Sequence, residues 1–534
     1  MPTANQVQMG QHLLGGVPSR QGTDTFQALD PTTGETLGVE FVEATMEEIQ
    51  RAMSLASEAH VVWKRLPRER RAHLLEAIAE EIEALGDELL EEAHRETALP
   101  MVRLMGERGR TTAQLRLFAD VVREGSFLEP RIDRAQPARQ PLPKPDLRSL
   151  RLPVGPVVVF GASNFPLAFS VAGGDTASAL AAGCPVVVKA HPSHPRTSEQ
   201  VASAIAKALR TLDLPAGTFS LVHGRSPEVG AALVEHPETR AVGFTGSLGA
   251  GRALFDLAAA RPRPIPVFAE MGSTNPVVLL PQALEKRGEE IAQGLAGSVS
   301  QGVGQFCTNP GLLLALRGEA TETFLQLLAS HLDQTAPGTM LHRGIRAQYD
   351  AGLERFRNTT GVRQVSVGAS GEELAETRAS LCQTDASTFL AHSMLAEEVF
   401  GPVTLLVTCS DEEELLHVAR SLEGQLTATV HAEAEDLSLV GDLLSILEEK
   451  AGRLLFGGYP TGVEICPAMH HGGPYPATTD AGSTSVGTAA VKRFTRPVCY
   501  QDLPQELLPV ELHDTNPDRI LRQVDGSWTR EDLS

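Results

Sequence analysis

The feature that most constrains the fold is a run of short apolar segments that alternate with helical ones between residues 154 and 258. The apolar segments are four or five residues long and rich in valine or phenylalanine, which favours strands. Strands are predicted at 156–160, 185–189, 219–222 and 241–244, and helices at 198–212, 227–234 and 248–258, after a small-residue helix ending near 180. Such repeats build a parallel sheet through right-handed crossovers, and the sheet binds ligands at the carboxyl ends of its strands.

The remaining sequence extends this α/β pattern on both sides. Thr45 and Glu48 form a capping-box pattern, and a long helix is expected over 67–94. Prolines crowd residues 129–147, which predicts a crossover or a protruding arm. A second α/β region is predicted from Asn275, with strands around 387–390, 403–408 and 453–456, a loop over 470–487 and a terminal strand at 493–500. The tail from Pro504 is polar and acidic and has no functional interpretation.

Length and composition exclude several classes of protein. A chain of 534 residues with 42% hydrophobic content can bury a large core in two or three domains. The net charge of −21 disfavours nucleic-acid and anionic-membrane partners, although a local basic pocket for phosphate stays open. Six cysteines form no metal-ligand or disulfide pattern, and neither a leader peptide nor a run of 18 apolar residues is found. We expect a cytoplasmic protein without a metal.

One cysteine and one glutamate suggest chemistry. Cys307 follows Gly304 and precedes Asn309 and Gly311, so a ligand can approach its thiol closely. An inert core thiol is the alternative. Glu270 ends an apolar run, which should raise its pKa by burial and make it a base, unless an arginine pairs with it. Asn164 is either an oxyanion donor or a turn residue before a Phe-Pro pair.

The segments around these residues resemble the aldehyde dehydrogenase superfamily in order and spacing. They are 160–166, 244–247, 268–276 and 303–311. Segments 168–175, 189–192, 460–464 and 471–476 are similar to the NADP-preferring group that includes α-ketoglutarate semialdehyde (2,5-dioxovalerate) dehydrogenases and a bacterial long-chain aldehyde dehydrogenase. The resemblance implies a three-domain α/β fold: a Rossmann-like cofactor domain (1–137 and 153–271), an α/β catalytic domain (272–470), a small β oligomerisation arm (138–152 and 485–503) and a C-terminal tail (504–534). A homodimer or homotetramer is expected.

The resemblance also implies the reaction. Cys307 adds to an aldehyde, the side chain of Asn164 and the Cys307 amide hold the oxyanion, hydride passes to nicotinamide, and Glu270 activates the water that releases the acid. α-Ketoglutarate semialdehyde is the expected substrate. The alternatives are a fatty aldehyde, resolution of the thioester by CoA instead of water, and a catalytically silent structural or binding protein.

The cofactor is expected to be NADP, with NAD as the alternative. Gly246, Ser247 and Gly251 form a strand-to-helix turn that suits a pyrophosphate. By resemblance, Lys189 binds the adenine ribose, Glu398 the nicotinamide ribose and Phe400 packs against it; Lys189 alone could be a sheet-edge lysine. NAD-preferring relatives carry a glutamate where this chain has Pro192, so no carboxylate there repels a 2′-phosphate. His191, Ser193 and Arg225 are the candidate phosphate ligands.

One departure from the family pattern affects the expected mechanism, and two further residues concern the substrate. Many relatives carry a Trp-Lys pair where this chain has Ala172 and Gly173, so a lysine proton relay cannot be transferred and the fate of the Cys307 proton stays open. Arg110 and Phe169 are the candidate substrate contacts. An arginine buried there needs an anion, which is either a substrate carboxylate or an internal partner such as Glu107 or Asp175.

Overall fold

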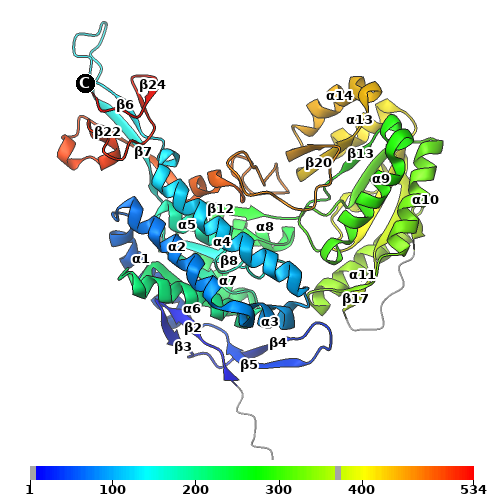
Figure 1. Ribbon diagram of the computed structural model, residues 1–534, viewed down its shortest axis with the longest axis horizontal. Coiled ribbons are helices and arrows are strands. Elements are labelled where there is room, and N and C mark those ends of the chain that lie inside the picture. Colours follow the sequence, from blue (N-terminus) through cyan, green and yellow to red (C-terminus); the bar gives the residue numbers. More distant parts are fainter. Residues whose placement is uncertain (1–7, 367–374, 534) are drawn as a thin grey trace, which may run out of the picture.

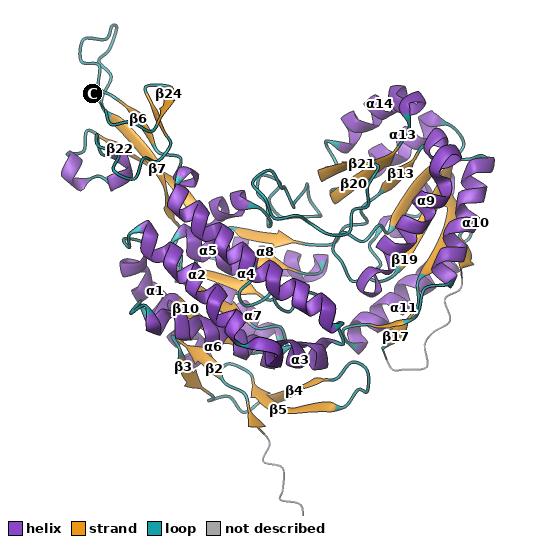
Figure 2. Cartoon of the chain, viewed as in Figure 1, coloured by secondary structure: helices purple, strands orange, loops and turns teal. Residues whose placement is uncertain are grey.

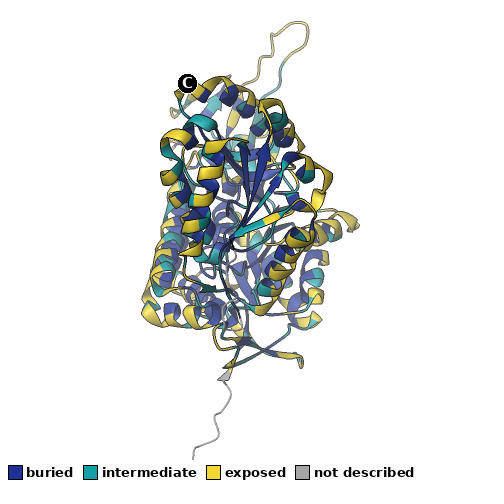
Figure 3. Cartoon of the chain, turned by 90° about the vertical axis from the view of Figure 1, so that its right-hand side faces the viewer, coloured by how far each residue is buried: buried dark blue, intermediate teal, exposed yellow. Residues whose placement is uncertain are grey.

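The computed structural model describes residues 8–366 and 375–533 and contains two seven-stranded sheets and a five-stranded one. Figure 1 shows the two large sheets side by side, with the smaller sheet projecting from the upper left. Helices cover the outer faces of the large sheets (Figure 2). Figure 3 shows that the strands inside these layers are buried while the outer helix faces are exposed. The predicted α/β class is confirmed.

The first large sheet has the order β12-β11-β8-β9-β10-β2-β3. Its five parallel strands are β8 (Val157–Phe160), β9 (Val186–Lys189), β10 (Phe219–Val222), β11 (Ala241–Thr245) and β12 (Val267–Glu270). The antiparallel edge is β2 (His12–Leu14) and β3 (Val17–Ser19). The chain leaves β8 in one direction and later returns to its other side, so the strand order switches there. Rossmann-type sheets bind cofactors at such a switch point.

Helices connect these strands close to the predicted positions. They are α5 (Gly174–Ala182), α6 (Pro195–Thr211), α7 (Pro227–Glu235) and α8 (Leu248–Ala260). The capping box is confirmed at the start of α1 (Met46–Trp63), where the Glu48 amide donates to Thr45 Oγ1. The expected long helix is interrupted, because Gly86 takes a left-handed φ of +64° between α2 (Arg68–Ala84) and α3 (Gly86–Thr97). Helix α4 (Met101–Glu124) then packs along α2.

The second large sheet has the order β16-β18-β19-β14-β13-β20-β21. Its strands are β13 (Val277–Leu279), β14 (Leu312–Leu316), β16 (Arg363–Ser366), β18 (Ser380–Asp385), β19 (Val403–Cys409), β20 (Gln425–His431) and β21 (Ala451–Phe456). The strand expected at 387–390 is wrong. That segment is α12 (Ala386–Ala391), because Asp385 Oδ1 accepts from the Thr388 amide at 2.8 Å and caps a helix where the strand ends. A short apolar run fits either structure.

The five-stranded sheet joins three distant parts of the chain in the order β22-β7-β6-β23-β24. The strands are β6 (Arg131–Asp133), β7 (Leu147–Pro153), β22 (Thr495–Gln501), β23 (Arg522–Val524) and β24 (Ser527–Thr529). The residues expected as a separate tail therefore supply two strands, and Leu512 packs with Ile132 and Leu150 beneath them. The boundaries of the arm and its role in oligomerisation stay predictions.

The other elements are shorter or lie at the periphery. They are β1 (Gln8–Met9), β4 (Thr25–Leu29), β5 (Thr36–Val42), β15 (Gly338–Thr339), β17 (Glu376–Thr377), α9 (Pro281–Ser300), α10 (Glu319–Asp333), α11 (Arg343–Asn358), α13 (Glu412–Ser421) and α14 (Leu437–Leu447), with 3₁₀ turns that include η3 (Gln301–Gly304) and η6 (Thr488–Phe494). Across the described ranges, the structure contains no helix with the length and apolarity needed to span a membrane.

A buried ion pair ties η6 to the start of α5. Arg493 Nη2 lies 2.7 Å from Asp175 Oδ1, and the two side chains are 3% and 12% exposed. The Arg493 guanidinium also lies over the Phe494 ring, 5.0 Å from its centroid. This pair anchors the chain on its way from the loop after residue 470 to the projecting sheet.

We expect Arg493→Met to lower the free energy of unfolding by about 3–5 kcal/mol, because it leaves the Asp175 charge buried without a partner. Urea unfolding followed by fluorescence measures the effect. The control is Arg252→Met, which breaks an exposed pair with Asp256 and should leave the unfolding midpoint nearly unchanged. Similar midpoints for both variants would show that the buried pair does not anchor η6.

Candidate active site

The loop that carries Cys307 is shaped by three consecutive left-handed residues. Gly302, Val303 and Gly304 have φ values of +57°, +60° and +64°, so η3 turns sharply after α9. A Cβ on Gly304 would lie 2.3 Å from the backbone of Gly401, so this position requires glycine. Asn275 Nδ2 then donates to the Cys307 carbonyl at 2.8 Å. These contacts fix the cysteine between the two large sheets.

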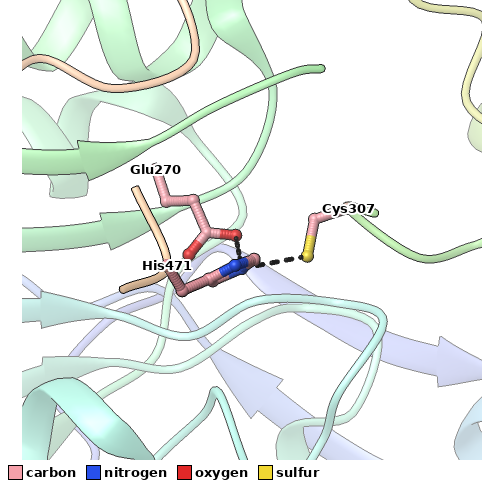
Figure 4. A group of neighbouring side chains, drawn as sticks. All are labelled: Glu270, Cys307 and His471. Carbon is pink, nitrogen blue, oxygen red and sulfur yellow. Dashed lines mark hydrogen bonds and ion pairs between the residues drawn. The ribbon is translucent and has the colours of Figure 1, made fainter. Parts of the chain in front are cut away.

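The Cys307 thiol contacts a histidine that in turn contacts Glu270 (Figure 4). Cys307 Sγ lies 3.4 Å from His471 Nε2, and that nitrogen lies 3.0 Å from Glu270 Oε1. The other carboxylate oxygen of Glu270 accepts from Ser485 Oγ at 2.5 Å. Glu270 and His471 are buried, while Cys307 is half-buried. The three side chains form a continuous thiol–imidazole–carboxylate chain.

The carboxylate of Glu270 is stabilised in its charged form. Burial raises its pKa, but the charge of His471 and the hydrogen bonds from His471 and Ser485 outweigh burial, so the pKa lies below its ordinary value. The prediction of a raised pKa is therefore wrong, because it considered only the apolar run before Glu270. The pairing partner is a histidine and not the arginine considered as the alternative.

The thiol itself is held in its protonated form. Burial raises the pKa of Cys307 well above its ordinary value, and the nearby charge of Glu270 raises it further. A thiol with such a pKa is a weak nucleophile at neutral pH until a base accepts its proton. His471 Nε2 is the nitrogen in position to accept it.

His471 was not among the sequence-based site residues. Its segment, 471–476, was used only for the family resemblance, and it lies 201 positions from Glu270 in the sequence. The available signal was a histidine within a glycine- and proline-rich loop, which suits a side chain presented to a site. The structure fixes this loop by hydrogen bonds between the His471 amide and Thr484 Oγ1 at 2.8 Å and between Ser485 Oγ and Glu270.

Asn164 lies beside the nucleophile loop. It follows β8, is 8% exposed, and its Nδ2 donates to the Gln305 carbonyl at 3.1 Å. Its carboxamide is therefore held two residues before Cys307. The structure thus brings together the three residues assigned to catalysis from the sequence.

The predicted adenosine-side residues gather at the carboxyl end of β9 and β10. Burial lowers the pKa of Lys189 to about 8. His191 Nδ1 accepts from the Ser193 amide at 3.2 Å, and the Arg225 side chain is exposed. Glu43 lies here as well: it accepts from the Arg225 and Ser226 amides at 3.2 and 3.0 Å. Glu43 thus places a carboxylate close to the expected 2′-phosphate ligands, although this chain has Pro192 at the position where NAD-preferring relatives carry a glutamate.

The residues predicted for the pyrophosphate follow β11, and those predicted for the nicotinamide ribose precede β19. Ser247 caps α8 by accepting from the Ala250 amide at 3.3 Å, which leaves a helix N-terminus beside Gly246. A Cβ on Gly251 would lie 2.7 Å from Met271, so glycine allows the close helix packing. Glu398 and Phe400 line a small cavity with Ser273 and Thr274, and burial raises the pKa of Glu398 to about 7.

Arg110, the candidate substrate contact on α4, lies beside Val463 and Phe169. Its Nη1 donates to the Val463 carbonyl, its guanidinium carbon lies 6.0 Å from the Phe169 centroid, and its Nε has no hydrogen-bond partner among the described residues. Asp175 is paired with Arg493, and Glu107 accepts from the Leu167 and Ala168 amides at 2.8 and 3.0 Å. Neither internal carboxylate forms an ion pair with Arg110 within the described ranges.

The thiol–imidazole–carboxylate group also has the donor set of a metal site. The ligand atoms of Glu270, Cys307 and His471 lie within 4.8 Å of one another. A ligating histidine usually donates its other ring nitrogen to a partner that fixes its orientation, but His471 Nδ1 has none in the described structure. The arrangement therefore suits proton transfer from the thiol better than retention of a resident ion.

Comparisons with known proteins identify the family. A model described as the aldehyde dehydrogenase family matches residues 17–444. The chain is 52% identical to alpha-ketoglutaric semialdehyde dehydrogenase 2 of Azospirillum brasilense, over 97% of this chain and 99% of that protein. It is 47% identical to the alpha-ketoglutaric semialdehyde dehydrogenase of Acinetobacter baylyi, over 98% and 99% of the two chains.

A solved structure shows the same fold at lower identity. The 1-pyrroline-5-carboxylate dehydrogenase from Thermus with bound NAD has a TM-score of 0.78 and 21% identity, over 93% of each chain. The likeness shows that this chain has the same fold as that enzyme. With relatives about half identical over nearly its whole length, the chain belongs to the aldehyde dehydrogenase family.

Proposed function

We propose that this aldehyde dehydrogenase oxidises α-ketoglutarate semialdehyde to 2-oxoglutarate with NADP. The observation that carries the substrate is Arg110, a half-buried guanidinium beside Phe169 that forms no ion pair in the described structure. A buried cation is stable only with an anion or strong hydrogen bonds, and the carboxylate of this substrate supplies an anion. The names of the two relatives above point to the same substrate.

The reaction begins with the removal of the Cys307 proton. His471 Nε2, 3.4 Å from the sulfur, accepts it in the tautomer that carries the ring hydrogen on Nδ1, and the imidazolium that forms then donates its Nε2–H to the Glu270 carboxylate 3.0 Å away. The thiolate attacks the aldehyde carbon, and the new oxyanion accepts hydrogen bonds from Asn164 Nδ2 and the Cys307 amide. His471 thus takes the place of the missing lysine relay at Ala172 and Gly173.

The thiohemiacetal then loses a hydride and becomes a thioester. When bound, the nicotinamide ring accepts this hydride. Glu270 receives a proton from water, which attacks the thioester carbonyl; the C–S bond breaks and Cys307 recovers a proton as the acid is released. Glu270, held by Ser485, argues for water rather than CoA as the acceptor, and a rate that is independent of added CoA tests this.

The assigned roles predict which step each variant slows. Cys307→Ala should abolish oxidation. His471→Gln should slow the first burst of NADPH by about 10²–10⁴-fold, the usual contribution of a positioned base, because the thiol keeps its proton. Stopped-flow absorbance of reduced nicotinamide measures the burst. His470→Gln, at the neighbouring half-buried position, is the control and should keep the burst.

Glu270→Gln separates the two halves of the same reaction. It should still release one equivalent of NADPH per site and then stall, because hydride transfer precedes the step in which water must be deprotonated. Trapping of the thioester by hydroxylamine identifies the stalled species. Normal steady-state turnover of this variant would show that Glu270 is not the base for deacylation.

Arg110 predicts selectivity for an anionic aldehyde. Arg110→Leu should lower kcat/KM for α-ketoglutarate semialdehyde by about 10–150-fold, equivalent to about 1.5–3 kcal/mol for a charge-assisted hydrogen bond, while sparing hexanal. Arg116→Leu, in an exposed pair with Glu83 on the same helix, is the control. Equal losses on both aldehydes would mark Arg110 as structural and support the fatty-aldehyde alternative.

The preference for NADP rests on Pro192, His191, Ser193 and Arg225, and Glu43 acts against it. Pro192→Glu should lower the NADP/NAD ratio of kcat/KM by about 10–100-fold through repulsion of the 2′-phosphate. Glu43→Gln should raise the ratio, since it removes a nearby negative charge. Glu235→Gln, an exposed position at the end of α7, is the control. Better use of NAD than of NADP by the unmodified enzyme would contradict the proposed preference.

A further inference from the structure

Arg103, in the first turn of α4, lies between the two loops that carry the proposed oxyanion donors. Its guanidinium carbon is 4.9 Å from the ring centroid of Phe165 and 4.9 Å from that of Phe306. Phe165 directly follows Asn164, and Phe306 directly precedes Cys307. The two rings also meet edge to face, with centroids 5.3 Å apart. One cation is therefore packed against a neighbour of each catalytic residue.

A hydrogen bond and close packing also hold the Arg103 guanidinium between the two loops. Arg103 Nη2 donates to the backbone carbonyl of Asn164 at 2.7 Å. A Cβ built on Gly302 would lie only 2.6 Å from Arg103 Nη1, so the glycine in the nucleophile loop makes room for the guanidinium. Arg103 thus contacts the loop after β8 and the loop after α9, which belong to different sheets.

The same helix holds the first loop at a second point. Glu107, one turn after Arg103, accepts from the amides of Leu167 and Ala168 and is buried. Its carboxylate is also the nearby opposite charge that offsets the cost of burying Arg103, because an opposite charge within several ångströms favours the charged form. Helix α4 therefore orients the Asn164 loop through both a cation and a carboxylate.

Correct spacing of the two donors matters for the reaction. An oxyanion hole works when its donors lie about 2.7–3.1 Å from the position that the oxyanion will occupy. Here one donor is the side chain of Asn164 from the first sheet and the other is the Cys307 amide from the second. Within the described residues, the hydrogen bond from Asn164 Nδ2 to the Gln305 carbonyl links the two loops directly. A further rigid connection between the loops would keep the spacing constant.

We propose that Arg103 is a positioning residue that fixes the Asn164 carboxamide relative to the Cys307 amide. This inference rests on the oxyanion role proposed above for both groups. Arginine suits the task because its planar guanidinium packs on two aromatic rings and donates in its own plane to a carbonyl, which a lysine ammonium cannot do at once. Arg103 acts in every oxyanion-forming step, whatever the aldehyde.

The test is a double-mutant cycle of Arg103→Leu and Asn164→Ala. Two rates are measured: the NADPH burst with saturating α-ketoglutarate semialdehyde or hexanal, and the hydrolysis of p-nitrophenyl acetate without cofactor. We expect each single variant to lose about 100-fold in the burst with both aldehydes, the usual cost of one oxyanion donor. The double variant should be no slower than Asn164→Ala, because Arg103 acts through Asn164.

Controls separate positioning from folding. Arg116→Leu, exposed on the same helix, should keep both rates, and alkylation of Cys307 by iodoacetamide should proceed at the normal rate in Arg103→Leu. Arg103→Lys keeps the charge and serves if the leucine variant does not fold; it should show a smaller loss with the same non-additivity. Guanidinium chloride at low millimolar concentration should partly restore the burst of Arg103→Ala.

The outcomes distinguish this inference from the proposed function. Losses that multiply in the double variant, or a normal burst in the Arg103 variants beside a slow Asn164→Ala, would overturn the positioning role alone. A normal burst in Asn164→Ala would overturn the oxyanion assignment and the positioning role with it. Selectivity between the two aldehydes is a separate readout, since Arg103 variants should change both equally.

Discussion

The contact between His471 and the Glu270 carboxylate is the interaction on which the catalytic centre depends. Without His471, the negative charge of the buried Glu270 would oppose formation of the Cys307 thiolate beside it. The imidazole changes this balance: with its hydrogen on Nδ1, its Nε2 lies 3.4 Å from the thiol and can take the proton, and it then donates the acquired Nε2–H to the carboxylate. A neutral Glu270 could not orient the imidazole in the same way.

This centre is assembled from three separate parts of the chain, so the fold must hold them together. β12 carries Glu270, the loop after α9 carries Cys307, and the loop before η6 carries His471. Ser485, in the same loop as His471, donates a hydrogen bond to Glu270. The Arg493–Asp175 pair anchors η6 on α5. The geometry of the thiol therefore depends on contacts outside the site, and η6 also packs on β12 itself, where the Phe494 and Phe268 ring centroids lie 5.7 Å apart.

Local patterns explain why much of the fold could be predicted from the sequence. Valine-rich strands between helices indicate a parallel sheet, and a glycine-flanked cysteine points to the proposed nucleophile, because each signal lies within a few residues. Three features could not be predicted from such local signals. Two depend on residues that are distant in the sequence, and the third lacks an apolar strand pattern. The pKa of Glu270 depends on His471, 201 positions away; Glu43 meets Arg225 only in space; and the strands of residues 522–529 are short and polar. The misassigned strand at 387–390 was decided by one capping carboxylate, Asp385.

Main-chain carbonyls, rather than carboxylates, hold the arginines on the substrate side, and this choice has an electrostatic consequence. Arg453 Nη1 donates to the Gly462 carbonyl at 2.9 Å, and Arg110 donates to the next carbonyl, that of Val463. Carbonyls orient a guanidinium without cancelling its charge, so both cations keep a positive potential near Cys307 in a chain with a net charge of −21.

That potential serves both reactants. Burial and Glu270 raise the pKa of Cys307, whereas the charge of Arg453 lowers it and so favours the thiolate. The same field would attract the anionic aldehyde proposed as the substrate. Its carboxylate would offset part of this positive charge and make the thiolate costlier to form. In the proposed mechanism, His471 and Glu270 then supply the driving force for deprotonation, which is why a site for an anionic substrate gains from a buried base in direct contact with its thiol.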